Sequence, residues 1–404
     1  MMTVGDPTLP NEITERARQL GPLESPLIWW VLAGWTVILL ALAVSMWRNR
    51  RVRRWAVAGA AVCLLLTLVT GVNSYVGYVR TPHDLGRLMQ RATGAVNGIG
   101  RLLDGDPNAP DVAISAEGGK DSGSGGGSAA PPPPPPPPPN SGKEGDARIE
   151  TLNIADPANA VPSGQHFVML PPGYFDPANA NRRYPVVYLL HGYPFGGPND
   201  WLTSGDTPGT LQELHNAKLI SPMIVVSPDM TAGQPSKDWE CLNVPDGPQL
   251  ETYLVNTVVP AIDKRFRTVA DRSGRALGGM SGGGFGALNI GLHHVDAFSV
   301  LAIALPYDDL NDSIGVLGGD QAAIRADTPR QYIPTMRFSG PIATMLAVGS
   351  GAPTDVGTAR RIADSLHRRG QEAVVHIERG FNHTWHTARA TLPYLLVFAD
   401  QHFH

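Results

Sequence analysis

GGMSGGGFGAL, residues 278–288, places a single serine, Ser281, among six glycines, and this stretch decides the fold of the chain. The residues before Ser281, Arg275–Met280, read as a buried strand, and Gly283–His293 after it reads as a helix. The pattern G-x-S-x-G at a strand-to-helix junction marks a tight turn that exposes a serine hydroxyl, and the glycines leave room for that turn. The stretch therefore predicts a nucleophilic serine. A flexible glycine loop is the alternative interpretation.

The rest of the chain from Arg148 onward has the alternation that this junction needs. Short apolar runs bounded by Gly and Pro alternate with longer helical patterns, which predicts a mostly parallel sheet with helices on both faces. We therefore expect residues 148–404 to form one α/β domain. The expected strands are His166–Leu170, Val186–Leu190, Met223–Ser227, Arg275–Met280, Ser299–Ala304, Thr344–Val348 and Val374–Glu378, and the expected helices are Leu250–Arg265, Gly283–His293, Gly357–Arg369 and Thr387–Gln401.

A serine hydroxyl becomes a nucleophile only with a base beside it, and the base needs a group that orients it. In this type of fold the order along the chain is serine, acid, histidine. His383, in RGFNHTW, follows the last expected strand and is the candidate base. Asp355, in the loop after Thr344–Val348, is the candidate acid. The alternative for Asp355 is to cap the following helix.

Two backbone amides are candidates for stabilising a developing oxyanion. One is the N–H of Gly282, at the start of the helix after Ser281, and the other is the N–H of Tyr193, after the strand in VVYLLHGYP. His191 is expected to hydrogen-bond within that loop. A zinc site is the rival interpretation of the histidines, but no H-E-x-x-H or comparable spacing is present, so neither a metal nor a cofactor is expected. Cys241 would be the nucleophile only if Ser281 were not.

The N-terminal part carries two long uncharged runs, Pro26–Trp47 and Trp55–Val79, each long enough to cross a bilayer as a helix. The sequence RNRRVRR between them favours a cytoplasmic loop. We therefore expect two transmembrane helices within residues 26–80, an extracytoplasmic tail over 1–25, and a multi-pass protein of the plasma membrane whose α/β domain is extracytoplasmic. A cleaved signal peptide and a pair of buried core helices are the alternatives.

Residues 81–147 are expected to join the hairpin to the α/β domain. Apolar spacing predicts an amphipathic juxtamembrane helix over 81–103, and the Gly, Ser and Pro content of 104–147 predicts a disordered linker. The nine prolines 131–139 would form a polyproline II rod of about 28 Å. The linker is expected to hold the domain away from the bilayer, with binding to an SH3-type partner as the alternative for the prolines.

Composition argues against a nucleic-acid partner and against a disulfide framework. The formal charge of −4 and a pI near 6.3 give no electrostatic basis for binding nucleic acid. The two cysteines, one in an apolar run and one far downstream, do not indicate a disulfide framework.

Motifs spread over nearly the whole α/β domain resemble those of one family. They are LLHGYP, VVSPD, DWEC…ETYL, GGMSGGGFGAL, GSGAPTD and NHTW. The chain resembles the esterase D group of α/β-hydrolases, which includes the mycolyltransferases of the antigen 85 type, and its two apolar runs resemble those of membrane-anchored actinobacterial members. By position, the resemblance implies Ser281 as nucleophile, Asp355 as acid and His383 as base, with Tyr193 and Gly282 as the oxyanion hole.

The resemblance also bears on the substrate. Trp385 matches a family tryptophan near the acyl site, and we expect it to contact the substrate together with His191 and Trp201. The mycolyltransferases have D-G-L-R where this chain has HGYP at 191–194, and that aspartate and arginine help to bind trehalose. The resemblance therefore implies acyl-ester chemistry without implying trehalose as the acceptor.

The expected function is that of a serine esterase or acyltransferase tethered to the membrane. Its substrate would be an acyl ester or a lipid-like molecule, and water or a sugar hydroxyl would accept the acyl group. The alternatives are mycolyltransferase-like transfer in the cell wall, a non-catalytic envelope-binding module, and a peptidase. S-formylglutathione hydrolysis, another activity of the group, is disfavoured because glutathione is cytoplasmic.

Overall fold

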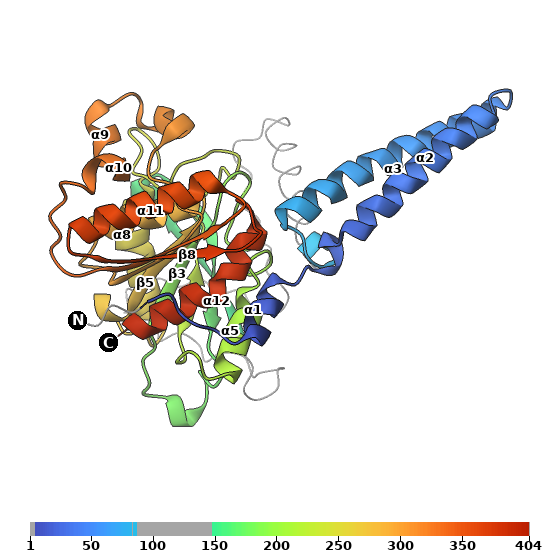
Figure 1. Cartoon of the computed structure of the whole chain (residues 1–404). Helices are drawn as coiled ribbons and strands as arrows, with labels where there is room; N and C mark the ends of the chain where they lie inside the picture. Colours follow the sequence, from blue (N-terminus) through green and yellow to red (C-terminus); the bar gives the residue numbers. More distant parts are fainter. Residues whose placement is uncertain (1–4, 83, 87–147, 404) are drawn as a thin grey trace, which may run out of the picture. The chain divides into compact units, whose positions relative to one another are not determined.

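The computed structural model describes residues 5–82, 84–86 and 148–403 (Figure 1). The expected linker over 104–147, with its proline rod, lies outside the described residues, as does nearly all of the amphipathic helix expected over 81–103. The described residues of the N-terminal part and of the α/β domain belong to one compact unit.

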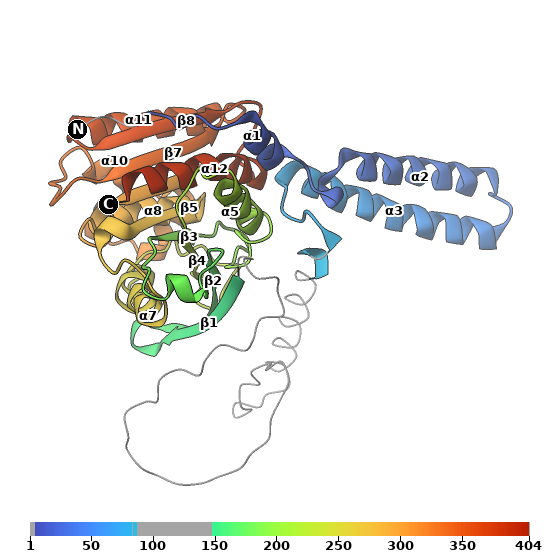
Figure 2. The same cartoon turned by 90° about the horizontal axis from the view of Figure 1, so that it is seen from below.

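An eight-stranded sheet forms the centre of the α/β domain, in the order β1-β2-β4-β3-β5-β6-β7-β8 (Figure 2). β1 and β2 pair antiparallel, β2 is antiparallel to β4, and the six strands from β4 to β8 run parallel. The strands are β1 (Arg148–Asp156), β2 (Val161–Leu170), β3 (Val186–Leu190), β4 (Ile224–Ser227), β5 (Arg275–Met280), β6 (Val300–Ala304), β7 (Ala343–Gly349) and β8 (Glu372–Glu378).

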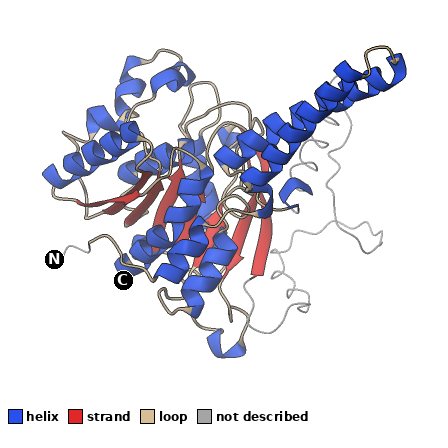
Figure 3. Cartoon of the chain, turned by 45° about the vertical axis from the view of Figure 1, so that its right-hand side comes forward, coloured by secondary structure: helices blue, strands red, loops and turns tan. Residues whose placement is uncertain are grey.

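Helices cover both faces of this sheet (Figure 3). One face packs against the α6–η4–α7 segment, α8 and α11, and the other packs against α5 and α12. The α-helices of the domain are α5 (Thr207–Asn216), α6 (Leu250–Tyr253), α7 (Val259–Arg265), α8 (Gly282–His293), α9 (Gln321–Ala326), α10 (Pro329–Tyr332), α11 (Pro353–Arg368) and α12 (Trp385–His402), and η4 (Leu254–Val258) joins α6 to α7. This is the α/β-hydrolase arrangement expected from the sequence.

One strand and several helices of the domain were not predicted from the sequence, for local reasons. β1 lies at the edge of the sheet, and its residues alternate between half-buried and exposed, so it lacks the apolar run of the central strands. α5 contains a proline and a glycine in its first turn, which weakens its helical pattern. α11 begins at Pro353, four residues before the expected start at Gly357, because proline is well tolerated at the first position of a helix.

The N-terminal part contains α1 (Asn11–Arg18), α2 (Pro26–Ser45) and α3 (Arg50–Val76). α2 and α3 pack against one another, have mean hydropathies of 2.3 and 2.1, and bury only 11% of their most apolar windows. They are therefore not core helices of the α/β domain, which was one alternative. α3 begins with the arginines before Trp55, because the side chain of Asn49 accepts a hydrogen bond from the Val52 amide and caps it.

The residues before α2 are packed onto the α/β domain, where the sequence predicted only a tail. α1 lies against α12 and α5. Arg18 Nη2 lies 2.8 Å from Glu378 Oε1 on β8, and His376 Nδ1, also on β8, lies 3.0 Å from the carboxylate of Asp6. The base of the hairpin, meaning the residues around the start of α2 and the end of α3, also contacts the α/β domain: Glu24 pairs with Arg389 and Ser74 with His386, and both of these partners lie on α12. The expected role of the linker lies outside the described residues.

The packing of the N-terminal segment is expected to depend on pH through His376. Burial lowers the pKa of His376, but its hydrogen bonds to Asp6 and Glu378 outweigh burial and raise that pKa to about 9. Since the folded-state pKa exceeds the ordinary value of 6.5, the stabilisation is fully present below about pH 6.5 and is lost as the pH rises through about 9. With Asp6 half exposed, we expect on the order of 1–3 kcal/mol to be lost.

Hydrogen exchange of residues 5–18, corrected for intrinsic rates, measures this loss at pH 6 and at pH 9.5. Asp6→Asn should remove most of the pH dependence, whereas Glu12→Gln, which removes an exposed carboxylate of the same segment, should leave it unchanged. Equal protection of wild-type residues 5–18 at both pH values would contradict the expectation.

Candidate active site

Ser281 lies at the turn between β5 and α8, in a backbone conformation that side chains rarely adopt. Its φ of 55° and ψ of −118° place it outside the common regions, which is typical of a residue held in place for function. The glycines around it allow this turn: a Cβ atom on Gly279 would overlap the carbonyl of Gly283, and one on Gly284 would lie 2.8 Å from the Ala304 oxygen. The turn thus depends on close backbone contacts that only glycine permits.

Gly283→Ala is expected to destabilise the protein by roughly 3 kcal/mol or more. The new Cβ would overlap the carbonyl oxygens of Leu190 and His191, which belong to the rigid end of β3 and its loop. Gly357→Ala is the matched control. Gly357 lies in α11, and no neighbouring atom lies within 4 Å of the position its added Cβ would take. This variant should be as stable as the wild type or more stable by up to about 1 kcal/mol. Denaturant unfolding of both variants measures the difference. Equal stabilities of the two variants would contradict the close packing inferred at the turn between β5 and α8, the elbow that carries Ser281.

The structure brings Ser281, His383 and Asp355 into one hydrogen-bonded line. His383 Nε2 lies 2.8 Å from Ser281 Oγ, and His383 Nδ1 lies 2.6 Å from Asp355 Oδ2. His383 follows β8 in the loop before α12, and Asp355 lies in the first turn of α11 rather than in a loop. Its carboxylate therefore bonds the histidine, and the capping alternative for Asp355 is wrong. This geometry suits a serine nucleophile, a histidine base and an orienting carboxylate.

The two candidate oxyanion donors lie next to one another beside Ser281. A Cβ atom built on Gly282 would lie 3.6 Å from the Cβ of Tyr193, and one on Gly192 would lie 3.7 Å from the Cβ of Ser281. Gly282 is the first residue of α8, so its N–H belongs to the unpaired amides of a helix start. The end of the β3 loop and the start of α8 thus form a place where two amides could hold one oxygen.

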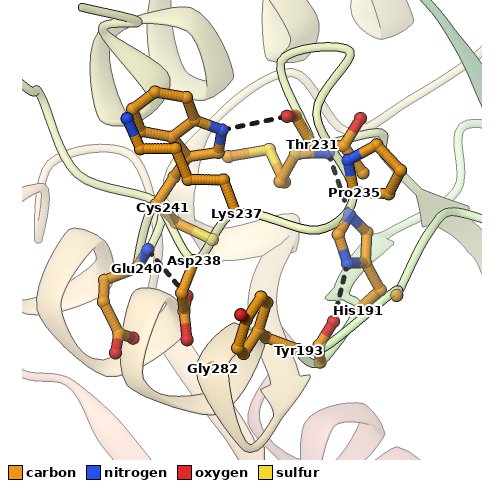
Figure 4. A pocket seen from close by; sticks show the side chains of 13 residues that line it. His191, Tyr193, Thr231, Pro235, Lys237, Asp238, Glu240, Cys241 and Gly282 are labelled. Carbon is orange, nitrogen blue, oxygen red and sulfur yellow. Dashed lines mark hydrogen bonds between the residues drawn. The ribbon is translucent and has the colours of Figure 1, made fainter. Parts of the chain in front are cut away.

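A cavity of about 30 Å³ lies beside Gly282, between the loop after β3 and residues 235–241 (Figure 4). His191, Tyr193, Asp238 and Glu240 are among the residues that line it. Asp238 Oδ1 lies 3.7 Å from the Cβ position of Gly282, and Asp238 and Tyr193 border the same space in Figure 4.

Glu240, in the wall of the cavity, was not singled out by sequence reasoning. It is buried, and the hydroxyl of Tyr307 donates a hydrogen bond to its carboxylate. Burial, with the charge of Asp238 nearby, raises the pKa of Glu240 to about 7. Glu240 and Cys241 both have positive φ, and this short loop lies close to α8, since a Cβ atom added to Gly286 would lie 2.6 Å from the Cβ of Cys241. The only sequence signal was the DWEC motif that contains it.

Two residues expected to contact substrate belong instead to the core. Trp201 is completely buried and donates from Nε1 to the Leu190 carbonyl, 2.8 Å away, and its ring packs edge-on against that of Trp385. Trp385 is itself buried, so neither ring offers a surface to a substrate. His191 lines the cavity, but its Nε2 accepts a hydrogen bond from the Met230 amide, which supports the loop.

The other candidate groups have structural partners. Cys241 is buried, and burial raises the pKa of its thiol well above the ordinary value, which disfavours a reactive thiolate. Glu251, His293 and Asp327 bring possible metal-binding atoms within 4.8 Å of one another, far along α8 from Ser281. Burial raises the pKa of Glu251, but hydrogen bonds to His293 and His294 lower it to about 2, so this cluster is an ion-pair network in the structure.

Comparisons with known proteins agree on the family. Residues 164–387, more than half of the chain, match the model of the family described as "Putative esterase". An uncharacterized protein of Corynebacterium glutamicum is 30% identical over 225 residues, which are 52% of this chain and 48% of that protein. Esterase Rv1288 of Mycobacterium tuberculosis is 30% identical over 193 residues, 42% of this chain and 40% of the esterase. The chain thus spans less than half the length of these relatives.

Solved structures support the fold. A ferulic acid esterase matches with a TM-score of 0.55 and 22% identity, covering 64% of this chain and 100% of that chain. The likeness supports a hydrolase arrangement of the strands and helices.

Proposed function

The chain belongs to the esterase family, and from that premise we propose that it is a membrane-anchored serine esterase whose catalytic domain lies outside the cytoplasm. The observation that carries the catalytic part is the hydrogen-bonded line from Ser281 Oγ through His383 to Asp355, at the end of a strained elbow. Such a line is the arrangement that turns a serine hydroxyl into a nucleophile.

In the proposed reaction, Ser281 Oγ attacks the ester carbonyl carbon while His383 Nε2 takes the hydroxyl proton. Asp355 accepts the Nδ1–H of His383 and stabilises the imidazolium that forms. The negative oxygen of the tetrahedral intermediate is held by the amides of Tyr193 and Gly282. The bond between carbonyl carbon and alkoxy oxygen then breaks, and His383 gives its proton to the departing alcohol, which leaves the acyl group on Ser281.

The acyl-enzyme is resolved by the same groups in reverse. His383 deprotonates water, which attacks the acyl carbon, and the proton returns to Ser281 Oγ as the acid leaves. Transfer to a sugar hydroxyl is the second candidate function. The side chain of His383 is 37% exposed, so an acceptor larger than water can approach its Nε2 from solvent.

The membrane part of the proposal rests on α2 and α3. Large apolar side chains are exposed all along both helices, and a bilayer is the environment that makes such surfaces stable. Five arginines stand at 48–54, in the turn after α2 and at the start of α3, which favours a cytoplasmic position for that end of the hairpin. Both ends of the hairpin, and with them the hydrolase domain, would then be extracytoplasmic.

Two experiments test the proposal on the full chain. Purified in detergent, it should hydrolyse p-nitrophenyl esters from acetate to palmitate, and the best chain length would show whether the acyl group is short or lipid-like. Failure on every ester, with and without sugar acceptors, would favour a non-catalytic module. For topology, an impermeant maleimide on intact cells should label Ser236→Cys on the domain and spare Asn49→Cys between the helices. The reverse pattern would overturn the orientation.

A further inference from the structure

A buried ion pair joins the base of the hairpin to the hydrolase domain. Glu24 stands two residues before α2 and is 0% exposed, and Arg389, on α12, is 1% exposed. The two guanidinium ends donate to the two carboxylate oxygens, each at 3.0 Å, in the bidentate geometry that is strongest and most directional. Burying two charges costs free energy that only a well-placed opposite charge can offset. Glu24 is therefore held in one position relative to α12.

The pair is part of a wider set of contacts between the hairpin base and α12. Arg389 also donates to the Ser204 carbonyl at 3.0 Å and lies 3.0 Å from Nδ1 of His386. Nε2 of His386 in turn contacts the carbonyl of Ser74, near the end of α3, at 3.0 Å. Gly77, which ends α3 with a φ of 71°, lies so close to the His386 ring that an added Cβ would be 2.7 Å from it. The ends of both hairpin helices thus meet α12.

The same base contacts the segment that follows the oxyanion loop. The Tyr78 hydroxyl donates to Asp200 at 2.9 Å, and Ser204 Oγ donates to the Tyr78 carbonyl at 2.6 Å. Trp201 lies between Asp200 and Ser204 in the sequence. Its ring nitrogen donates a hydrogen bond to the Leu190 carbonyl at the end of β3, and its ring packs on Trp385. The hairpin base is therefore fixed to two segments next to the proposed active site: the segment that follows the loop carrying the Tyr193 amide, and the helix that follows His383.

These contacts leave little distance between the proposed site and the start of the apolar helices. Arg389 lies on α12, which begins at Trp385, two residues beyond His383, so about 6 Å of helical rise separates the start of that helix from Arg389. α2 begins two residues after Glu24, and α3 ends at Val76, just before Gly77. Tyr193 and Phe195, on the loop at the site, are 42% and 67% exposed. Aromatic side chains exposed beside a membrane boundary suit the bilayer interface.

We propose that the Glu24–Arg389 pair fixes the hydrolase domain with its active site at the bilayer surface, so that the enzyme takes its acyl ester from the membrane rather than from solution. The inference rests on the proposed membrane anchoring and esterase activity, and it specifies their substrate as an ester resident in the bilayer, with its carbonyl near the interface. Glu24 and Arg389 are positioning residues: they touch neither substrate nor the reacting atoms.

The test compares two esters with one enzyme preparation. The full chain is reconstituted into phosphatidylcholine vesicles carrying the long-chain ester 4-methylumbelliferyl oleate, and soluble p-nitrophenyl butyrate is assayed in the same vesicles. Glu24→Gln and Arg389→Met should each lower oleate turnover by about tenfold or more, because the site no longer keeps one orientation toward the bilayer. Butyrate turnover should stay within about twofold, because a soluble ester reaches the site from any orientation.

Controls separate loss of positioning from loss of folding. Glu15→Gln and Arg360→Met change exposed residues of the same types and should leave the ratio of oleate to butyrate turnover unchanged. Hydrogen exchange of residues 74–80 should rise in the Glu24→Gln and Arg389→Met variants, which would show that the contact has opened. Parallel loss of both activities would overturn the inference, and so would an unchanged ratio despite faster exchange.

Failure of the proposed function would look different. If the wild-type chain hydrolysed neither ester, the esterase proposal would fail, and if alkaline carbonate released it from vesicles, the membrane anchor would fail. Either result overturns the inference as well. A wild-type chain that is integral and active, with a ratio that the pair does not affect, contradicts the inference alone.

Discussion

Ser281→Ala is expected to lower kcat for ester hydrolysis by roughly 10⁴- to 10⁶-fold and to change KM little. The variant loses only the Oγ atom that His383 Nε2 contacts at 2.8 Å, so no covalent intermediate can form. The oxyanion amides and the substrate surface remain, which is why binding should survive. Steady-state kinetics on the best p-nitrophenyl ester, with the full chain in detergent, measures both constants.

Ser236→Ala is the matched control for this variant. Ser236 is an exposed serine whose backbone carbonyl accepts a hydrogen bond from the Tyr193 hydroxyl, so it is near the site while its hydroxyl is absent from the proposed chemistry. Its activity should stay close to wild type. A Ser281→Ala enzyme that kept more than about a hundredth of wild-type kcat would contradict the covalent route.

Asp355→Asn is expected to lower kcat by about 10⁴-fold while the protein stays folded. The carboxylate accepts the Nδ1–H of His383 at 2.6 Å and so leaves Nε2 free to take the serine proton. An amide in its place can present an N–H to Nδ1, which selects the tautomer with a proton on Nε2 and removes the base. The loss should appear in kcat with both short and long esters, because it concerns the chemical step alone.

Asp364→Asn tests whether this effect belongs to Asp355 or to the charge of α11. Asp364 lies on the same helix and is exposed, so its variant changes the same charge without touching His383. It should retain wild-type kinetics. Equal losses in the two variants would show that Asp355 acts through the helix, and full activity of Asp355→Asn would remove it from the mechanism.

The elbow and its partners could be predicted because their signals are local. The glycines around Ser281 are required by contacts within a few residues of the turn, and the order of strands along the chain limits which histidine can reach it. The family match confirms the resemblance that the motifs indicated. Asp355 was predicted in a loop, but Pro353 starts α11 early and places it in the first turn.

The tryptophans and the docking of the hairpin could not be read from the sequence in the same way. A tryptophan near a catalytic residue along the chain can face the site or the core, and Trp201 and Trp385 face the core because their rings pack on one another. Glu24 and Arg389 are 365 residues apart, and two opposite charges so distant leave no local pattern. Such contacts become visible only when the fold brings the segments together.

The most direct test of the central claim is covalent labelling of the full chain with a fluorophosphonate. The account predicts that Ser281 Oγ attacks phosphorus and expels fluoride, so that mass spectrometry finds one phosphonyl group, on the peptide containing Ser281, and none in Ser281→Ala. A label on another residue, or ester turnover by an enzyme that never labels at Ser281, would contradict the proposed mechanism.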